Sequence, residues 1–378
     1  MSRTSNGPGA EKPVDHLIKP LTSIRFFAAL AVVIFHSGAS FVSVNPHVPG
    51  PLKTLLMNGY VGVTFFFVLS GFILHQTYRG RIATVGEVKR FGIARFARLY
   101  PVYILAVLAM LPFTTLAGWG DVPQFFLLHW WIPNGALGWT DWNMPSWTLS
   151  VEFFFYLCFP LISRGAARVG TRWLITIIAT LLCFDLITAG SSAIDNRTVM
   201  FGWMHWIPIP LLRLPEFVIG ICAAEIVLRG DRVAVPSWVP AVALIAGLCV
   251  SGNPRMAAFA TAMAVLLIAA IASDDRGSTF AKALSARWLV ILGGASYAMY
   301  LMHQPVHFAV ERWLGSSKAM IALQYPILII GAVAMFHFIE EPMRKRIRAV
   351  GRMKPSTGDQ IDRMIDPRLP DAISGGLR

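Results

Sequence analysis

The sequence is poor in charge for its length. Only 14% of its 378 residues are Asp, Glu, Lys or Arg, whereas 55% are hydrophobic and the mean hydropathy is +0.59. Because soluble domains average about 25% charged residues, this chain lacks the polar surface that a water-soluble globule needs. The composition therefore predicts an all-α, polytopic integral membrane protein.

Cysteine is also scarce. The four cysteines fall inside apolar runs, without CxxC or any other metal-ligand spacing: Cys158, Cys183, Cys222 and Cys249. We expect buried thiols, no metal site and no permanently bound cofactor. The first apolar run has no small-residue cleavage site, so we expect this span to stay attached. The net charge of +13 does not indicate nucleic-acid binding, because the basic residues lie in short loops between apolar runs.

Ten apolar runs, bounded by charged residues, Pro or Gly, predict about ten transmembrane helices. They are Leu21–Phe41, Gly59–Leu74, Leu99–Leu116, Trp147–Ile162, Trp173–Ala189, Ile207–Leu228, Trp238–Ser251, Met256–Ala272, Trp288–Phe308 and Met320–Ile339. With a cytoplasmic N-terminus, 26 of the 33 Lys and Arg residues fall in cytoplasmic segments and only five outside. This excess predicts that both termini are cytoplasmic.

The same reading divides the chain into three parts. Residues 1–19 form a polar cytoplasmic N-terminal segment, residues 20–342 a transmembrane domain, and residues 343–378 a basic, partly disordered cytoplasmic tail. The predicted external loop before the fourth span, together with the start of that span, is rich in tryptophan: Trp119, Trp130, Trp131, Trp139, Trp142 and Trp147. These residues predict either an aromatic belt at the membrane surface or a surface that stacks on a sugar or polyprenyl acceptor.

Ionisable residues at membrane depth are costly and usually functional. His36 and His303 each lie roughly 22 Å from the inner end of their spans, at ~1.5 Å per residue. Glu152 and Arg213 lie roughly 8–9 Å below the outer ends of theirs, so all four fall in one layer of the outer half. Arg25 stands about three helical turns before His36 on the same helix face. The alternatives are a snorkelling Arg25 and a His36 that is an ordinary core histidine.

Two further basic segments stand out. Arg213 and Glu216 have the i, i+3 spacing that allows an ion pair within a helix, and a structural role is the favoured interpretation. The stretch RFGIARFARLYP (90–101) reads as a cytoplasmic loop. Its arginines Arg95 and Arg98 suit phosphate groups, although such loops also anchor topology.

Six motifs, in this order, resemble acyltransferase family 3, the bacterial membrane O-acyltransferases that modify O-antigens, exopolysaccharides and some macrolides. They are Arg25 with His36, GVTFFFVLSGFIL (62–74), RFARLYP (95–101), NMPSWTLSVEFFFYL (143–157), GGASYAMYLMHQPV (293–306) and IEEPMRKR (339–346). The chain departs from the family pattern at Phe153, where a second Glu often follows, and at Gln304, which is often Trp. Both departures bear on the choice of acceptor.

The resemblance implies acyl transfer from cytoplasmic acyl-CoA, most simply acetyl-CoA, to a hydroxyl of a cell-surface glycan or its lipid-linked precursor in the bacterial inner membrane. Arg25, Arg95 and Arg98 would bind the donor. His36, Glu152 and His303 would be catalytic, with His36 acting as a general base or as a nucleophile.

Four more residues would position the acceptor or have a structural role: Arg213, Glu216, Trp147 and Tyr300. The expected partners are the donor, the glycan, membrane lipids and polysaccharide-biosynthesis proteins. Ser70 is expected to pack helices rather than to attack the thioester. The rival prediction is a transporter of a sugar or lipid-linked glycan, although no second copy of the Arg–His helix is present. A non-catalytic assembly subunit is the third alternative.

Overall fold

The computed structural model describes residues 13–131, 140–188, 207–253, 255–274 and 277–350, and in these ranges it is helical, without a strand. The longer helices are α1 (Pro13–Val44), α3 (Val61–Tyr78), α4 (Val85–Ala109), α6 (Trp147–Arg168), α7 (Thr171–Thr188), α10 (Leu214–Leu228), α11 (Trp238–Val250), α12 (Met256–Ala272), α14 (Arg287–Leu314), α15 (Lys318–Met335) and α16 (Glu341–Val350). Shorter helices are α2 (Gly50–Met57), α5 (Val122–Phe125), α9 (Ile209–Leu212) and α13 (Thr279–Leu284). The predicted all-α class is confirmed.

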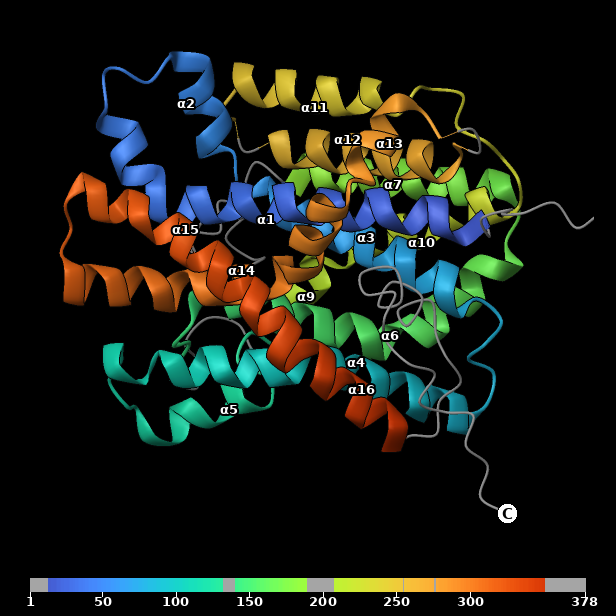
Figure 1. The fold of residues 1–378 in the computed structure, drawn as a ribbon. Helices are drawn as coiled ribbons and strands as arrows, with labels where there is room; N and C mark the ends of the chain where they lie inside the picture. The colour runs from blue at the N-terminus through green and yellow to red at the C-terminus, as the bar shows by residue number, and fades with distance from the viewer. Residues whose placement is uncertain (1–12, 132–139, 189–206, 254, 275–276, 351–378) are drawn as a thin grey trace, which may run out of the picture.

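Five helical segments of the described residues are long and apolar enough to cross a membrane. They are Lys19–Gly38, Val61–Tyr78, Val85–Phe113, Met144–Arg168 and Lys318–Ile347, and two shorter apolar helices are Trp238–Val250 and Met256–Ala272. These lengths and compositions identify a membrane protein. The start of α1 and the end of α16 lie at the same end of the bundle, on the right of Figure 1.

Glycines let two pairs of helices approach closely. A Cβ atom at Gly71 of α3 would overlap the Phe217 carbonyl of α10, and one at Gly220 of α10 would overlap the Val68 carbonyl of α3. In the same way, a Cβ atom at Gly293 of α14 would overlap a backbone carbonyl of α1. Such small-residue contacts hold helices together in a bilayer, where the hydrophobic effect between helices is weak. The α1–α14 contact brings together the helices that carry His36 and His303.

The basic segment 90–101 is helical, which corrects the prediction of a loop. Helix α4 begins at Val85, where the Thr84 side chain accepts a hydrogen bond from the Glu87 backbone and the Glu87 side chain accepts one from the Thr84 backbone. This capping box satisfies the first amide groups of the helix and starts it well before the apolar run. Hydrophobicity marks where a chain crosses a membrane, not where its helix begins.

Two other boundaries differ from the prediction. The span predicted as 207–228 is broken at Arg213, which ends α9 and precedes α10. Pro215 has no N–H to donate to a preceding turn, so the helix restarts there. At the C-terminal side, the boundary predicted at residue 343 falls inside α16, which follows a π-helical turn at Phe336–Glu340.

The expectation of four buried thiols is right only in part. All four cysteines are free; Cys222 is buried, Cys158 and Cys249 are half-buried, and Cys183 is exposed on α7. A residue on the outer face of a membrane helix meets lipid, so an apolar run does not by itself predict burial.

Candidate active site

His36 and His303 form the centre of the site. Their rings stack with centroids 5.2 Å apart and planes inclined by 12°, and His303 Nε2 lies 3.2 Å from His36 Nδ1. His303 is 3% exposed, and its Nδ1 lies 2.5 Å from the Tyr300 carbonyl oxygen. Two candidates from opposite ends of the sequence thus form one imidazole pair.

The partners of these rings fix their tautomers. A carbonyl oxygen only accepts hydrogen bonds, so His303 Nδ1 carries a proton and donates it to Tyr300. In a neutral His303 the Nε2 atom is then an acceptor, and His36 Nδ1 is the donor across the pair. A neutral His36 therefore has its lone pair on Nε2, which is the form that accepts a proton or attacks a carbonyl.

Glu152 belongs to a second cluster, next to Arg25. Its Oε1 atom accepts hydrogen bonds from the Ser70 hydroxyl at 3.0 Å and from the Tyr156 hydroxyl at 2.5 Å. Arg25 lies within electrostatic reach of Arg98, Glu340, Glu152 and Tyr156. Membrane depth predicts Glu152 in one layer with His36, whereas its hydrogen bonds are made with Ser70 and Tyr156. Ser70, expected only to pack helices, also anchors this carboxylate.

The two arginines of α4 have different surroundings. Arg95 is 7% exposed, donates from Nη2 to the Tyr78 hydroxyl at 3.1 Å, and lies 5.4 and 5.9 Å from the ring centroids of Tyr78 and Phe91. Arg98 instead lies within electrostatic reach of Arg25. Among the residues that the structure describes, neither Arg25 nor Arg98 makes a hydrogen bond or a close ion pair. Arg25 thus has one cation, Arg98, and two carboxylates, Glu340 and Glu152, within electrostatic reach.

Arg213 and Glu216 make the ion pair that their spacing predicts. Arg213 Nη2 lies 2.7 Å from Glu216 Oε1, and the Thr64 hydroxyl lies 3.0 Å from the former and 3.1 Å from the latter. The Arg213 guanidinium also sits 5.4 Å from the centroid of the Phe67 ring. These contacts tie α10 to α3, which agrees with the structural role expected for the pair.

The tryptophans of the segment predicted to be external mostly pack inward. Trp142 and Trp147 are 7% and 3% exposed, whereas Trp119 is 89% exposed. Trp130 donates its indole N–H to Asp141, and Trp131 donates to the Ser150 carbonyl. Trp139 lies outside the described residues. Burial of Trp147 between neighbouring rings favours its structural role over acceptor stacking.

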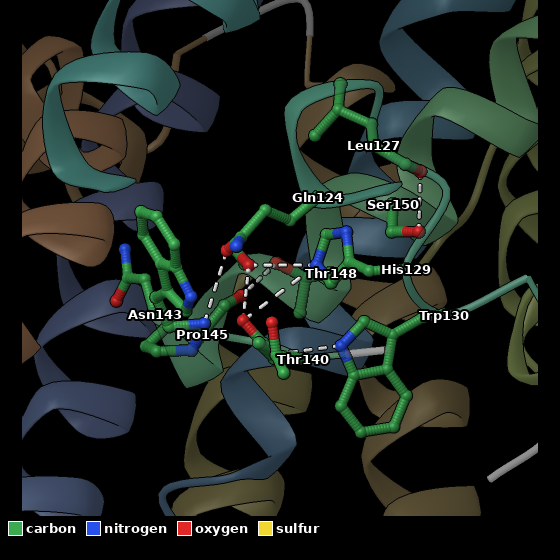
Figure 2. Close-up of polar contacts among 12 residues, drawn as sticks. Gln124, Leu127, His129, Trp130, Thr140, Asn143, Pro145, Thr148 and Ser150 are labelled. Carbon is green, nitrogen blue, oxygen red and sulfur yellow. Dashed lines mark hydrogen bonds and ion pairs between the residues drawn. The ribbon is translucent and has the colours of Figure 1, made fainter. Parts of the chain in front are cut away.

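A buried polar network organises this segment, as Figure 2 shows around Gln124, His129 and Thr140. His129 Nε2 lies 3.0 Å from Ser146 Oγ, which donates to Asp141 at 3.0 Å. The single Ser146 proton is thereby used, so His129 Nε2–H is the donor to Ser146 and Nδ1 is unprotonated. Burial lowers the pKa of His129 from 6.5 to about 3, so the ring is neutral.

Asp121 in the same segment is ionised. Burial alone would raise its pKa, but hydrogen bonds donated by Thr140, Trp142 and the Ala117 backbone outweigh burial and lower the pKa below its usual value of 3.8. A carboxylate that accepts three hydrogen bonds holds the loop together as long as it stays charged.

An ionic cluster that the sequence did not predict joins α3, α6 and α10. Glu225 is fully buried and accepts hydrogen bonds from His75 at 2.8 Å, from Arg79 at 2.6 and 2.8 Å, and from Arg229 at 2.8 Å. Arg229 also donates to the Val169 carbonyl just after α6. Arg79 and Arg229 lie in predicted loops, where charges usually face water, and Glu225 lies close to the end of its predicted span, so the sequence did not single out the cluster. Within the described residues, no three His, Cys, Asp or Glu side chains gather into a possible metal site.

The fold and these clusters define a helical membrane protein with an imidazole pair among its helices. The chain belongs to acyltransferase family 3, whose model, described as an acyltransferase domain, matches residues 20–337. It is 31% identical to acyltransferase MdmB of Streptomyces mycarofaciens over 89% of this chain and 93% of that protein.

A second relative extends beyond this chain. The identity to O-acetyltransferase OatA of Staphylococcus aureus strain MRSA252 is 26% over 91% of this chain, which spans 60% of OatA. No solved structure gives a significant match.

The family match and the two relatives identify the protein as a membrane O-acyltransferase, and they favour acyl transfer over the transport alternative.

Proposed function

We propose that the protein moves an acyl group, most simply acetyl, from cytoplasmic acyl-CoA to a hydroxyl of a cell-surface polysaccharide or its lipid-linked precursor. The observation that carries the proposal is the hydrogen-bonded imidazole pair, in which the Tyr300 carbonyl directs the lone pair of neutral His36 to Nε2. Its relatives named as an acyltransferase and an O-acetyltransferase support the class of reaction.

The proposal includes a topology of about ten spans with both termini in the cytoplasm of the bacterium, in the inner membrane. The excess of Lys and Arg in alternate loops supports this orientation. The shared position of the start of α1 and the end of α16 in Figure 1 agrees with it. Membrane lipids, the glycan and polysaccharide-biosynthesis proteins are the proposed partners.

The proposed donor site lies between Arg25 and Arg98. Their mutual repulsion would be relieved by the phosphate groups of CoA, which arginine binds well. Arg95 is engaged with Tyr78 and supports this wall of the site. Arg25 and His36 both lie on α1, so an extended pantetheine arm that runs along this helix would bring the thioester to the imidazole pair.

The chemistry follows from the tautomers. His36 Nε2 takes the proton of the acceptor hydroxyl as its oxygen attacks the thioester carbonyl, a C–O bond forms, the C–S bond breaks, and the CoA thiolate takes up the proton. The same lone pair would serve if His36 first accepted the acyl group itself. Intact mass spectrometry of enzyme mixed with donor alone distinguishes the two routes, because only the second leaves an acyl adduct.

The first test is the acyl content of the surface glycan. Mass spectrometry compares cells that lack the protein with cells that express the wild type, His36→Ala, or His47→Ala, a control in an exposed position of the same half of the chain. We expect the acyl mass with wild type and the control, and none with His36→Ala at equal membrane levels. Normal acylation by His36→Ala would refute the catalytic assignment.

The second test is donor binding. Purified Arg98→Ala is compared with Arg90→Ala, an exposed arginine two turns earlier on α4. Removal of a charge-assisted contact worth about 1.5–3 kcal/mol weakens acetyl-CoA binding roughly 10- to 100-fold in the first variant and little in the second. Equal affinities would remove Arg98 from the donor site.

A further inference from the structure

The helix that carries His303 has a defect in its hydrogen-bond ladder. Pro305 lies inside α14 and has no N–H, so the carbonyl of Leu301, four residues earlier, lacks its helical partner. An unpaired carbonyl in a membrane interior is costly. The Leu301 carbonyl lies two residues before His303, so the position of this backbone affects the direction of the His303 imidazole.

Asn143 supplies the missing hydrogen bond. Its Nδ2 donates to the Leu301 carbonyl at 3.1 Å, and the side chain is completely buried. Asn143 comes directly before the 3₁₀ turn Met144–Ser146 that leads into α6. A second contact joins the same two segments, because the Tyr300 hydroxyl donates to the Pro145 carbonyl at 3.2 Å. Asn143 and Pro145 are drawn in Figure 2.

These contacts continue into the imidazole pair. The Tyr300 carbonyl accepts from His303 Nδ1, and His303 Nε2 accepts from His36 Nδ1. Asn143 contacts Leu301, and Pro145 contacts Tyr300. The backbone positions of Leu301 and Tyr300 in turn decide the direction of the His303 side chain. We propose that Asn143 is a positioning residue, which replaces the hydrogen bond lost at Pro305 and so aligns His303 and, through it, His36. The inference rests on the proposed role of His36.

A double-mutant cycle tests the proposal. Pro305→Ala restores an N–H that bonds the Leu301 carbonyl within the helix, which makes the Asn143 donor redundant. In the wild-type background, Asn143→Ala is expected to lower kcat roughly tenfold, about the value of one lost hydrogen bond that governs alignment, with KM for acetyl-CoA unchanged. In the Pro305→Ala background, the same change is expected to lower kcat less than twofold. Asn253→Ala, at an exposed asparagine, is the matched control.

Two additions keep the test decisive. Asn143→Asp has almost the same size but no N–H to donate, so it replaces Asn143→Ala if that variant does not fold. The same cycle is also read from the ¹⁵N signals of the His36 and His303 rings, which report tautomers without turnover. We expect the signals to change with Asn143 in the wild-type background and not in the Pro305→Ala background.

The outcomes separate the two proposals. An equal loss of kcat and equal ¹⁵N changes in both backgrounds would overturn the positioning role of Asn143 while the wild type still transfers acyl groups. A rise in KM at constant kcat would also overturn it. If the proposed function itself were wrong, the wild type would transfer no acyl group, and if only the role of His36 were wrong, His36→Ala would be as active as the wild type, whatever the cycle gave.

Discussion

Acidification tests whether His129, in the segment between α4 and α6, is buried in its neutral form. In the folded protein, burial lowers the pKa of this imidazole from 6.5 to about 3, whereas the unfolded chain exposes it to water. Above pH 6.5 the ring is neutral in both states, and the stability that it contributes is fully present. As the pH falls from 6.5 toward 3, only the unfolded state binds the proton, so this stability is progressively lost.

The size of the effect follows from the two pKa values. Between pH 7.5 and pH 5 the folded ring stays neutral and the unfolded ring becomes almost fully protonated, which costs the folded state about 2 kcal/mol. Asp121 does not contribute in this range, because its pKa already lies below 3.8. The loss of unfolding free energy in this pH range is therefore specific to imidazoles that are buried in the neutral form.

The measurement is the free energy of unfolding in detergent micelles, from denaturant titrations at pH 7.5 and pH 5. His129→Gln keeps an amide N–H for Ser146 but does not titrate. We expect the wild type to lose about 2 kcal/mol more than this variant between the two pH values, because the other titrating groups are common to both proteins. Equal losses in the two proteins would show that His129 is not buried in its neutral form.

Three other substitutions test the packing of the helices. Glu225→Gln leaves Arg79 and Arg229 without their carboxylate and is expected to cost about 3 kcal/mol of unfolding free energy, whereas Glu311→Gln, at an exposed position, changes it by less than about 0.5 kcal/mol. Gly220→Ala places a Cβ atom on the Val68 carbonyl and is expected to lower the apparent unfolding temperature, because overpacking costs about 1–3 kcal/mol; the control Gly92→Ala, in open space, gains about 0.5–1 kcal/mol. Arg213→Met strands the buried Glu216 carboxylate, and we expect a loss of about 3–5 kcal/mol, seen as a lower yield of monodisperse protein.

The sequence predicted the class of fold and the residues at its centre for physical reasons. Apolar runs must be helical in a bilayer because backbone groups have no water to bind, so the all-α class followed from composition. Equal depth along two helices is also a local property: it places His36 and His303 in one layer, and in the structure their ring nitrogens lie 3.2 Å apart. The i, i+3 spacing likewise predicted the pair of Arg213 with Glu216.

Properties that depend on distant parts of the chain were not predictable in this way. The helical start of α4 depends on a capping box in a polar segment, which hydropathy does not reveal. The role of Asn143 depends on a carbonyl 158 residues away that is free only because Pro305 follows it. Membrane depth placed Glu152 in one layer with His36, but depth contains no information about the azimuth of a helix, and its contacts lie with Ser70 and Tyr156.

The charged residues of this membrane domain differ in how completely hydrogen bonds and ion pairs satisfy them. Glu225 is surrounded by four donated hydrogen bonds, and Glu216 has both an arginine and a threonine. The four hydrogen bonds of Glu225 join helices and leave that carboxylate little to offer a substrate, whereas Glu216 Oε2 and Arg213 Nε are buried without a hydrogen-bond partner. Arg25 and Arg98 differ, since in the described part of the chain they lie within electrostatic reach of one another and are not bonded to a carboxylate, although Glu340 and Glu152 lie within reach of Arg25. A membrane protein that keeps two cations in this arrangement carries an electrostatic cost, which an anionic ligand would reduce on binding. This cost is the physical reason for our proposal that CoA phosphates bind near these two arginines.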